Sequence, residues 1–510
     1  MKVTGITAEF DPFHNGHKYL LDLAAMRANK EKAGGEKAVG GEGTDGKGTG
    51  GGKAVDDEGA EDGVRAAADE KIANDTKCAI MVVMSGDFTQ RGMPSFYDKR
   101  LRVEAALRNG ADLVVELPYV YACNTADVFA EGSIRIMVDC GAVDNIFFGR
   151  ECEDENLLVR AAKIIEMTEP DIKINAQISE SSYDSYVASN SSDSDSKPAG
   201  DSDSNSDSVP GVSGPGSNPD DDLISAFQSS FRSLLKRGLS YPAALSKAAG
   251  ETFGQEIEHE LKSPNNILAI RYINAVRKYA PHMAINSILR KGEGHSGKSE
   301  ACESGERRDN DFSMISGSKI RKAVSRGEKE ILRSSIPASV YDIFSGKDFC
   351  LPGDDFYRLL RYRIITSAKH LKDIYSVSEG IENRLLEAAY SSETFEEFIS
   401  GVRTRRYTDA RLMRMFSHIL MNFTYEDYDE IKDVSYLRVL GFTDRGAKIL
   451  SDIKKNSEIT IISNLSKLRY LPEKVKKSVE IDMRAADVRN MIMGRNLKDY
   501  SERKYKPVKI

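Results

Sequence analysis

The 510-residue chain has no apolar run of about 18 residues, the length that a membrane-spanning helix needs. Its first residues lead directly into a strand pattern and carry only Lys2 as a charge. A secretory signal peptide would instead place a longer apolar segment after its basic residues. We therefore expect neither a membrane span nor a signal peptide. The length is sufficient for two or three domains with cores of their own.

Cysteine is scarce and scattered. The six cysteines form no Cys-x-x-Cys pair and have no histidine at metal-ligand spacing: Cys78, Cys123, Cys140, Cys152, Cys302 and Cys350. Disulfide frameworks and structural zinc sites normally show regular spacing. We therefore expect reduced thiols in a cytoplasmic protein and no metal site.

A net positive charge is also lacking, since the formal net charge of the chain is −7, but two low-complexity stretches account for this balance. Residues 30–72 hold eleven acidic and seven basic side chains, and residues 179–222 hold ten acidic and one basic. Without them the remaining chain carries +6. Such Gly-, Ser- and Asp-rich segments bury too little apolar area to offset chain entropy. We predict flexible insertions at about residues 30–75 and 179–222, the alternative being partner-binding tails.

The rest of the first 330 residues alternates between strand and helix patterns. Strands are predicted at Val3 to Ala8, Cys78 to Met84, Leu113 to Leu117 and Asn145 to Phe148, and helices at Gly16 to Ala28, Arg100 to Arg108 and Thr125 to Val138. Continuous apolar strands suit a parallel sheet that is covered on both faces. We predict an α/β domain with a Rossmann-like, doubly wound parallel sheet over residues 1–330, with a loop at about residues 291–311.

The most specific pattern is the segment from Glu9 to His17, between the first strand and the first helix. A helix N-terminus at this edge of a parallel sheet offers unpaired N–H groups and a partial positive charge to an anion. His14 and His17 can then face the same phosphate, and Gly16 lets the backbone approach it closely. The alternative is an ordinary turn with surface histidines.

Two other strand ends and one helix start offer further candidates. Asp87 and Arg91 follow the second strand and can meet a metal or a phosphate, or form ordinary ion pairs. Gly149 follows another strand, where it suits either a tight turn or a nucleotide contact. The segment from Ile315 to Arg321 sets hydroxyl groups and an arginine at the start of a helix.

From about residue 331 onward helical patterns dominate, at Tyr357 to Ser367, Ile381 to Tyr390, Ser392 to Val402, Tyr407 to Asn422 and Tyr436 to Leu440. Residues 401–510 hold 24 basic and 15 acidic side chains. Clustered arginines and a tyrosine near residue 407 can contact a phosphate backbone or stack on a base. A basic helix face that simply meets solvent is the alternative. We predict a mainly α-helical, basic domain over residues 331–510.

These motifs together resemble a known family. The sequence Pro-Phe-His-x-Gly-His looks like the HxGH signature of the nucleotidyltransferase and class I synthetase superfamily, and Ile315 to Arg321 resembles its Ile-Ser-Ser-Thr-x-Ile-Arg motif. Eight ordered segments are similar to those of the bacterial tRNA(Met) cytidine acetate ligases: Glu9 to His17, Met84 to Gly92, Asn109 to Pro118, Phe147 to Glu151, Ser240 to Pro242, Ser263 to Leu268, Ser316 to Arg321 and Arg405 to Arg414. The likeness covers the chain apart from the low-complexity stretches and the loop at 291–311.

The resemblance implies that ATP and acetate form acetyl-adenylate with release of pyrophosphate, and that the acetyl group passes to the exocyclic amine of the wobble cytidine in elongator tRNA(Met). It implies catalytic roles for His14, His17 and Arg321, with Mg²⁺ accompanying the triphosphate. The implied ATP site comprises Thr7, Ala8, Glu9, Phe10, Asp11, Pro12, Phe13, His14, Asn15, Gly16, His17, Lys18, Tyr19, Leu20, Gly149, Asn265, Arg290, Ser316 and Ser318. The tRNA contacts would be Arg405, Arg406, Tyr407, Arg411 and Arg414. A small-molecule adenylyltransferase and a non-catalytic RNA-binding protein remain alternatives.

Overall fold

The computed structural model describes residues 1–35, 78–166, 219–290, 315–404 and 407–510. They form two compact units. The first comprises Met1–Arg150, Ala275–Arg403 and Asp409–Ile510, and the second comprises Glu151–Asn274 and Thr404–Thr408. The C-terminal residues thus share a unit with the N-terminal strands, a grouping that differs from the predicted division near residue 330. The predicted insertions and loop lie largely outside the described residues.

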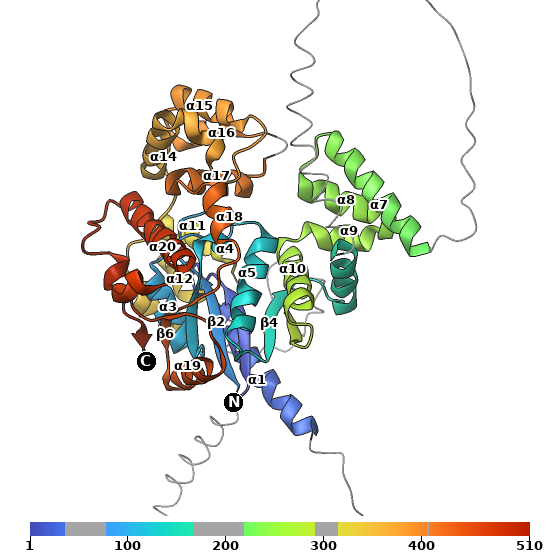
Figure 1. Ribbon diagram of the computed structural model, residues 1–510, viewed down its shortest axis with the longest axis vertical. Coiled ribbons are helices and arrows are strands. Elements are labelled where there is room, and N and C mark those ends of the chain that lie inside the picture. The colour runs from blue at the N-terminus through green and yellow to red at the C-terminus, as the bar shows by residue number, and fades with distance from the viewer. Residues whose placement is uncertain (36–77, 167–218, 291–314, 405–406) are drawn as a thin grey trace, which may run out of the picture. The chain divides into compact units, whose positions relative to one another are not determined.

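Within the described chain, the first unit is built on an eight-stranded sheet in the order β5-β4-β1-β2-β3-β6-β7, with β8 also paired to β6 (Figure 1). The strands are β1 Val3–Ala8, β2 Ala79–Ser85, β3 Leu113–Leu117, β4 Asn145–Arg150, β5 Ala284–Leu289, β6 Leu437–Phe442, β7 Ile461–Ile462 and β8 Val508–Lys509. Strands β1 to β5 are mutually parallel. The predicted fold class is therefore confirmed, with a parallel α/β sheet followed by a largely helical C-terminal region.

Strand β6 shows that the helix predicted at Tyr436 to Leu440 is wrong. It runs antiparallel to β3, with Val115 opposite Val439, and it is joined in parallel by β7 and β8. All five residues of the predicted helix are buried. A short apolar run of this kind is compatible with a buried helix or a buried strand, and here the open edge of β3 decides between them.

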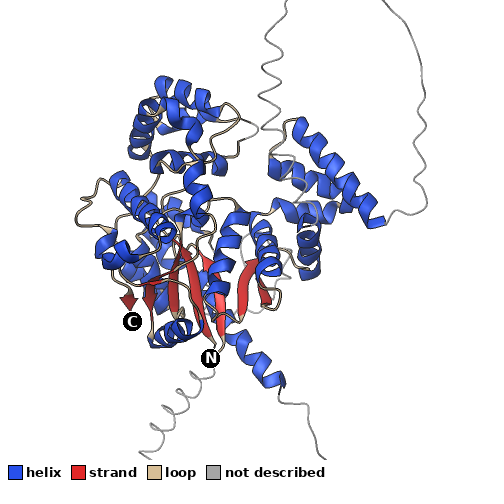
Figure 2. Cartoon of the chain, viewed as in Figure 1, coloured by secondary structure: helices blue, strands red, loops and turns tan. Residues whose placement is uncertain are grey.

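Helices cover both faces of the sheet (Figure 2). Ile6 belongs to a core cluster with residues of α1 and α3, whereas a Cβ on the neighbouring Gly5 would lie 2.6 Å from Met137 Sδ of α5. Because successive strand residues point to opposite faces, α1 and α3 lie on one face and α5 on the other. None of the described helices is both long and apolar enough to cross a membrane.

The helices of the first unit are α1 Asn15–Gly35, α3 Lys99–Arg108, α4 Tyr119–Ala122, α5 Ala126–Asp139, α11 Gly317–Ser325, α12 Lys329–Ser335, α13 Ala338–Phe344, α14 Asp354–Thr366, α15 Ile381–Ser391, α16 Phe395–Val402, α17 Asp409–Met421, α18 Tyr425–Ile431, α19 Asp444–Asn456 and α20 Glu473–Ile492, with 3-10 turns η1 Ala368–Asp373, η2 Leu465–Tyr470 and η3 Glu502–Lys504. The second unit is helical, with residues 155–166, α7 Pro219–Lys236, α8 Tyr241–Phe253, α9 Gln255–Lys262 and most of α10 Pro264–Tyr279.

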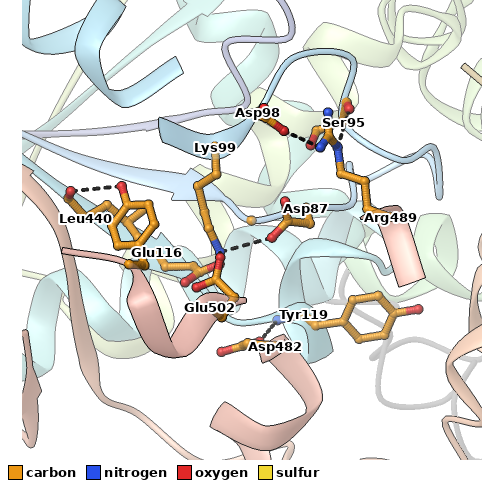
Figure 3. A network of polar contacts seen from close by, with 12 residues as sticks. Asp87, Ser95, Asp98, Lys99, Glu116, Tyr119, Leu440, Asp482, Arg489 and Glu502 are labelled. Carbon is orange, nitrogen blue, oxygen red and sulfur yellow. Dashed lines mark hydrogen bonds and ion pairs between the residues drawn. The ribbon is translucent and has the colours of Figure 1, made fainter. Parts of the chain in front are cut away.

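A buried ion network joins the ends of the central strands to the C-terminal segment (Figure 3). Lys99 Nζ lies 3.0 Å from Asp87 Oδ2, 2.6 Å from Glu116 Oε1 and 3.0 Å from Glu502 Oε1. Arg438 pairs with both Glu116 and Glu502. Asp87 therefore takes part in an internal ion pair, one of the two roles that its sequence position allows.

Candidate active site

The two histidines cap the N-terminus of α1. His14 immediately precedes the helix, and its Nδ1 accepts the N–H of Gly16 at 3.1 Å. His17 lies three residues later, and its Nδ1 accepts the N–H of His14 at 3.2 Å. This reciprocal pattern resembles a capping box, with imidazoles in place of the usual hydroxyl and carboxylate, except that His14 accepts from the second helical residue rather than the third. The His-x-x-His spacing thus places both rings together, stacked with centroids 3.8 Å apart.

The hydrogen bonds also fix the proton on each ring. A nitrogen that accepts an N–H carries no proton, so in the neutral form each imidazole keeps its proton on Nε2. Burial, and then the charges of Arg290 and Arg321, lower the pKa of His14 to about 3. Burial, His14 and Arg290 hold the pKa of His17 well below its usual range. At neutral pH the site therefore offers two uncharged Nε2–H donors.

The neutral pair predicts a pH dependence of stability. In the unfolded chain a histidine titrates near pH 6.5, so below that pH the unfolded state binds protons that the folded state cannot. The free energy of unfolding then falls by up to about 1.4 kcal/mol per pH unit for each such histidine. Between pH 7 and pH 5, the free energy of unfolding measured in urea should decrease less in His14→Gln than in the wild type. Identical losses would contradict a neutral His14.

Gly16 is required by the position of the His14 ring. A Cβ on Gly16 would lie 2.9 Å from His14 Cε1 and 3.0 Å from Nδ1. Alanine favours a helix over glycine by about 1 kcal/mol, so Gly16→Ala is expected to keep the fold while it displaces the ring. We expect at least a tenfold loss of nucleotide-dependent activity with little change in thermal unfolding. Gly353→Ala, at a position with nothing within 4 Å of the added Cβ, is the matched control and should leave activity unchanged.

Arg321 joins the histidine turn to α11. Its Nη1 donates to the backbone oxygen of Asp11 and lies 3.4 Å from Asp11 Oδ2. The Asp11 carboxylate in turn accepts the N–H of Phe96 at 2.6 Å. Gly317 begins α11 beside this pair, since its Cβ position is 3.2 Å from Asp11 O and 3.8 Å from His14 Cδ2. The two predicted phosphate-binding segments therefore meet.

The serines of the second segment stand at the helix start. Ser316 occupies the N-cap position of α11 without a side-chain capping bond, and Ser318 lies in the first turn. Both are exposed. Hydroxyl groups and unpaired amides at a helix N-terminus are suited to an anion.

Gly149 and Arg290 lie together at the ends of β4 and β5. Arg290 N–H donates to Arg150 O at 2.7 Å, and a Cβ on Gly149 would lie 2.9 Å from Arg290 Cγ. Arg290 contributes to the lowered pKa of both histidines. Two predicted residues that are distant in sequence are thus brought to the same strand ends as the histidine turn.

Several predicted ATP-site residues support the turn from within. Phe10 has a positive φ of 49°, is fully buried and packs 5.0 Å from both Phe13 and His17, measured between ring centroids. Asn15 Nδ2 donates to Ser334 O at 3.0 Å. The remaining members of this stretch end β1, form the turn or continue α1: Thr7, Ala8, Pro12, Lys18, Tyr19 and Leu20. These contacts are internal to the protein, and they account for the conformation of the turn.

Sequence reasoning missed Arg102, which holds the ends of β1 and β2. This fully buried side chain of α3 donates to the backbone oxygens of Glu9 at 2.8 Å and Ser85 at 3.0 Å, and also to that of Gly86. A second connection runs from Gln90 N–H to Glu9 Oε1 at 2.6 Å. An arginine on an otherwise buried helix face was the available signal, but its partners are backbone atoms that leave no pattern in the sequence.

Asn265 belongs to the second unit. There Glu151 accepts hydrogen bonds from both Ser263 Oγ and Asn265 Nδ2. The buried Asn266 Oδ1 accepts the N–H of Glu151 at 2.8 Å. The Ser-Pro-Asn-Asn segment thus organises the start of this unit around Glu151.

The residues predicted to contact tRNA lie in different parts of the structure. Arg405 and Arg406 lie outside the described residues, and Tyr407 is buried in the second unit. Arg411 lies on α17, 3.6 Å from Glu379 Oε1. Arg414, on the same helix, donates to Gln90 O at 3.4 Å, and burial lowers its pKa. Across the described ranges, no group of three His, Cys, Asp or Glu side chains is placed to hold a metal ion.

Comparison with known proteins identifies relatives over nearly the whole chain. A tRNA(Met) cytidine acetate ligase of Thermoanaerobacter sp. (strain X514) is 28% identical over 496 residues, which is 96% of this chain and 94% of the relative. One from Clostridium perfringens is 28% identical over 499 residues, with the same two shares. A crystal structure of Thermotoga maritima TmcAL bound with alpha-thio ATP matches with a TM-score of 0.69 at 23% identity, over 100% of this chain and 99% of that chain, and so shares the fold.

The resemblance seen in the motifs is therefore confirmed. The relatives are ligases by name, and the protein is an enzyme of that class. The sequence model of the family described as HIGH Nucleotidyl Transferase matches residues 1–33, 67–207 and 221–504. With its histidine turn intact and most of its length matched, the chain belongs to the HIGH nucleotidyl transferase family.

Proposed function

We propose that this protein is an ATP-dependent tRNA(Met) cytidine acetate ligase. It activates acetate as acetyl-adenylate, releases pyrophosphate and acetylates the exocyclic amine of the wobble cytidine in elongator tRNA(Met). The observation that carries the proposal is the stacked pair of neutral imidazoles, each with its proton on Nε2, beside Arg290 and Arg321. The names of the relatives supply the substrates.

The geometry suits adenylation. Attack of acetate on the α-phosphorus builds negative charge on the equatorial oxygens, which two preorganised Nε2–H donors can stabilise without a covalent intermediate. Arg321, held by Asp11, and the exposed Ser316 and Ser318 at the start of α11 would hold the departing pyrophosphate.

Magnesium would accompany ATP and neutralise the charge of its phosphates. Because the described residues present no cluster of three ligand side chains, the phosphates and water would supply most of its ligands. The acetyl transfer then depends chiefly on holding the cytidine amine against the mixed anhydride.

The test is ATP–pyrophosphate exchange with and without acetate, followed by nucleoside analysis of tRNA incubated with the protein. Acetate-dependent exchange together with acetylcytidine in tRNA(Met) supports the ligase. Exchange that responds to a mononucleotide instead of acetate favours a small-molecule adenylyltransferase. The complete absence of exchange favours a non-catalytic RNA-binding protein.

Charge reversal at Arg405 and Arg406 tests the RNA side of the proposal. Replacing two cations with anions weakens contact with the phosphate backbone. We expect weaker tRNA binding, with a shallower salt dependence, and unchanged acetate-dependent exchange. Equal damage to exchange and binding would contradict separate nucleotide and RNA surfaces.

A further inference from the structure

Acetyl transfer to cytidine requires a proton acceptor. The exocyclic amine is a poor nucleophile, and it must lose a proton as its bond to the acetyl carbon forms. A positioned side chain that accepts such a proton typically contributes about 10²–10⁴-fold to the rate. The need for a proton-accepting side chain rests on the proposed function, because an enzyme that only adenylates its substrate would not have to deprotonate an amine.

The histidines and Asp11 are poorly suited to this task. Both Nδ1 atoms already accept backbone N–H groups, and both Nε2 atoms carry protons. The Asp11 carboxylate is engaged by Arg321 and by the N–H of Phe96. Within the described part of the histidine turn, Glu9 is the remaining ionisable group with an oxygen still available.

Glu9 directly follows β1 and is only partly buried. Its Oε1 accepts the N–H of Gln90 at 2.6 Å, while its Oε2 accepts no hydrogen bond within the described chain. The charged and titratable groups that face it are Asp11, Arg102, Arg321 and Cys123. Burial is the largest effect on Glu9, and it raises the pKa of this carboxyl above its ordinary value of 4.5. A raised pKa makes a carboxylate a stronger base.

The Glu9 carboxylate is directed to the β2 side of the histidine turn, where it accepts the N–H of Gln90. Gly149 and Arg290 lie at the ends of β4 and β5, on one side of β1 in the strand order, whereas Gln90 follows β2 on the other side. An acceptor that reaches the acetyl group from the β2 side would meet Glu9.

The helix α17 holds the turn that positions Glu9. Ser417 Oγ donates to Gly92 O at 2.6 Å, and Arg414 Nη1 donates to Gln90 O at 3.4 Å. A Cβ on Gly92 would lie 2.3 Å from Arg414 N, so this approach requires glycine. The same helix carries Arg411, a predicted tRNA contact. The partner of Glu9 is therefore fixed by an element that also belongs to the predicted RNA-binding surface.

We propose that Glu9 is the general base of acetyl transfer. The amine lone pair attacks the carbonyl carbon of acetyl-adenylate and forms the carbon–nitrogen bond, and Glu9 accepts the proton that the amine loses. The bond between that carbon and the phosphate oxygen breaks, and AMP leaves with its electron pair. The proton then passes from Glu9 to solvent.

The variant Glu9→Gln tests this role because its amide oxygen can still accept the N–H of Gln90. Acetate-dependent ATP–pyrophosphate exchange should fall far less than transfer, because Glu9→Gln keeps the hydrogen bond that holds the turn, and tRNA binding should be unchanged. Single-turnover acetylation of tRNA from preformed acetyl-adenylate should fall by about 10²–10⁴-fold. Glu480→Gln, an exposed carboxylate on α20, is the matched control and should transfer at the wild-type rate.

A pH profile separates a base from a merely structural residue. Below its pKa Glu9 is protonated, so the wild-type transfer rate should fall as the pH is lowered, and this acidic limb should be absent from the residual rate of Glu9→Gln. Loss of exchange together with transfer, or an unchanged acidic limb in the variant, would overturn the proposal. A wild-type protein that exchanges with acetate but acetylates no tRNA would overturn the proposed function, and the assignment of Glu9 with it.

Discussion

Alanine in place of His17 is expected to lower acetate-dependent ATP–pyrophosphate exchange by about 10²–10³-fold, the usual cost of losing one preorganised donor. The variant loses one of the two Nε2–H groups and also the Nδ1 acceptor of the His14 N–H, so the remaining ring is held less firmly. The affinity for tRNA should be nearly unchanged, since neither lost contact involves the basic helices. Steady-state exchange and a gel-shift titration of tRNA(Met) measure the two quantities on the same preparation.

His14→Ala should also lower acetate-dependent exchange. The double variant should exchange only slightly more slowly than either single variant. Both rings stabilise one another through the cap and serve the same charge, so their effects are not additive. His282→Ala removes an exposed histidine ahead of β5 and should leave exchange unchanged. Strictly additive losses in the double variant would mean that the two rings act on separate groups.

Much of the candidate site could be predicted from patterns among residues that are close in sequence. The order of strand, turn and helix around His14 and His17 is written within fewer than twenty residues, because a capping box and a parallel strand depend on neighbours in sequence. The glycine between the histidines is equally local, since the ring that it accommodates belongs to the residue two positions earlier. These features could be predicted without knowledge of the tertiary structure.

Contacts between distant segments could not be predicted in the same way. The run from Tyr436 to Leu440 has no pattern that distinguishes a helix from a strand, and only the unpaired edge of β3 makes it a strand. Arg414 looks like one cation of a basic cluster, but its guanidinium is directed to the Gln90 turn, which is 324 residues away. A charge in a sequence does not reveal whether it meets solvent, RNA or the protein itself.

Replacing Lys99 with methionine is expected to destabilise the first unit by about 3–5 kcal/mol, the usual cost of breaking a buried ion pair by removing one partner. Lys99 Nζ is within 3.0 Å of three carboxylates, those of Asp87, Glu116 and Glu502, and its side chain is 3% exposed. Methionine fills a similar volume, but it leaves Glu116 and Glu502 with Arg438 as their remaining ion-pair partner among the described residues. Urea unfolding at pH 7, followed by circular dichroism, measures the loss.

The control for Lys99→Met lies on the same helix. Arg108→Met also removes a cation paired with a glutamate, but this side chain is 50% exposed, and an exposed pair contributes at most about 1 kcal/mol. The pH dependence adds a second test. Without Lys99 the buried acids bind protons more readily when folded, so the gap between variant and wild type should narrow as the pH falls from 7 toward 5. A gap that is small at pH 7, or one that does not narrow on acidification, would mean that well-packed apolar contacts, rather than the ion network, hold the C-terminal segment to the sheet.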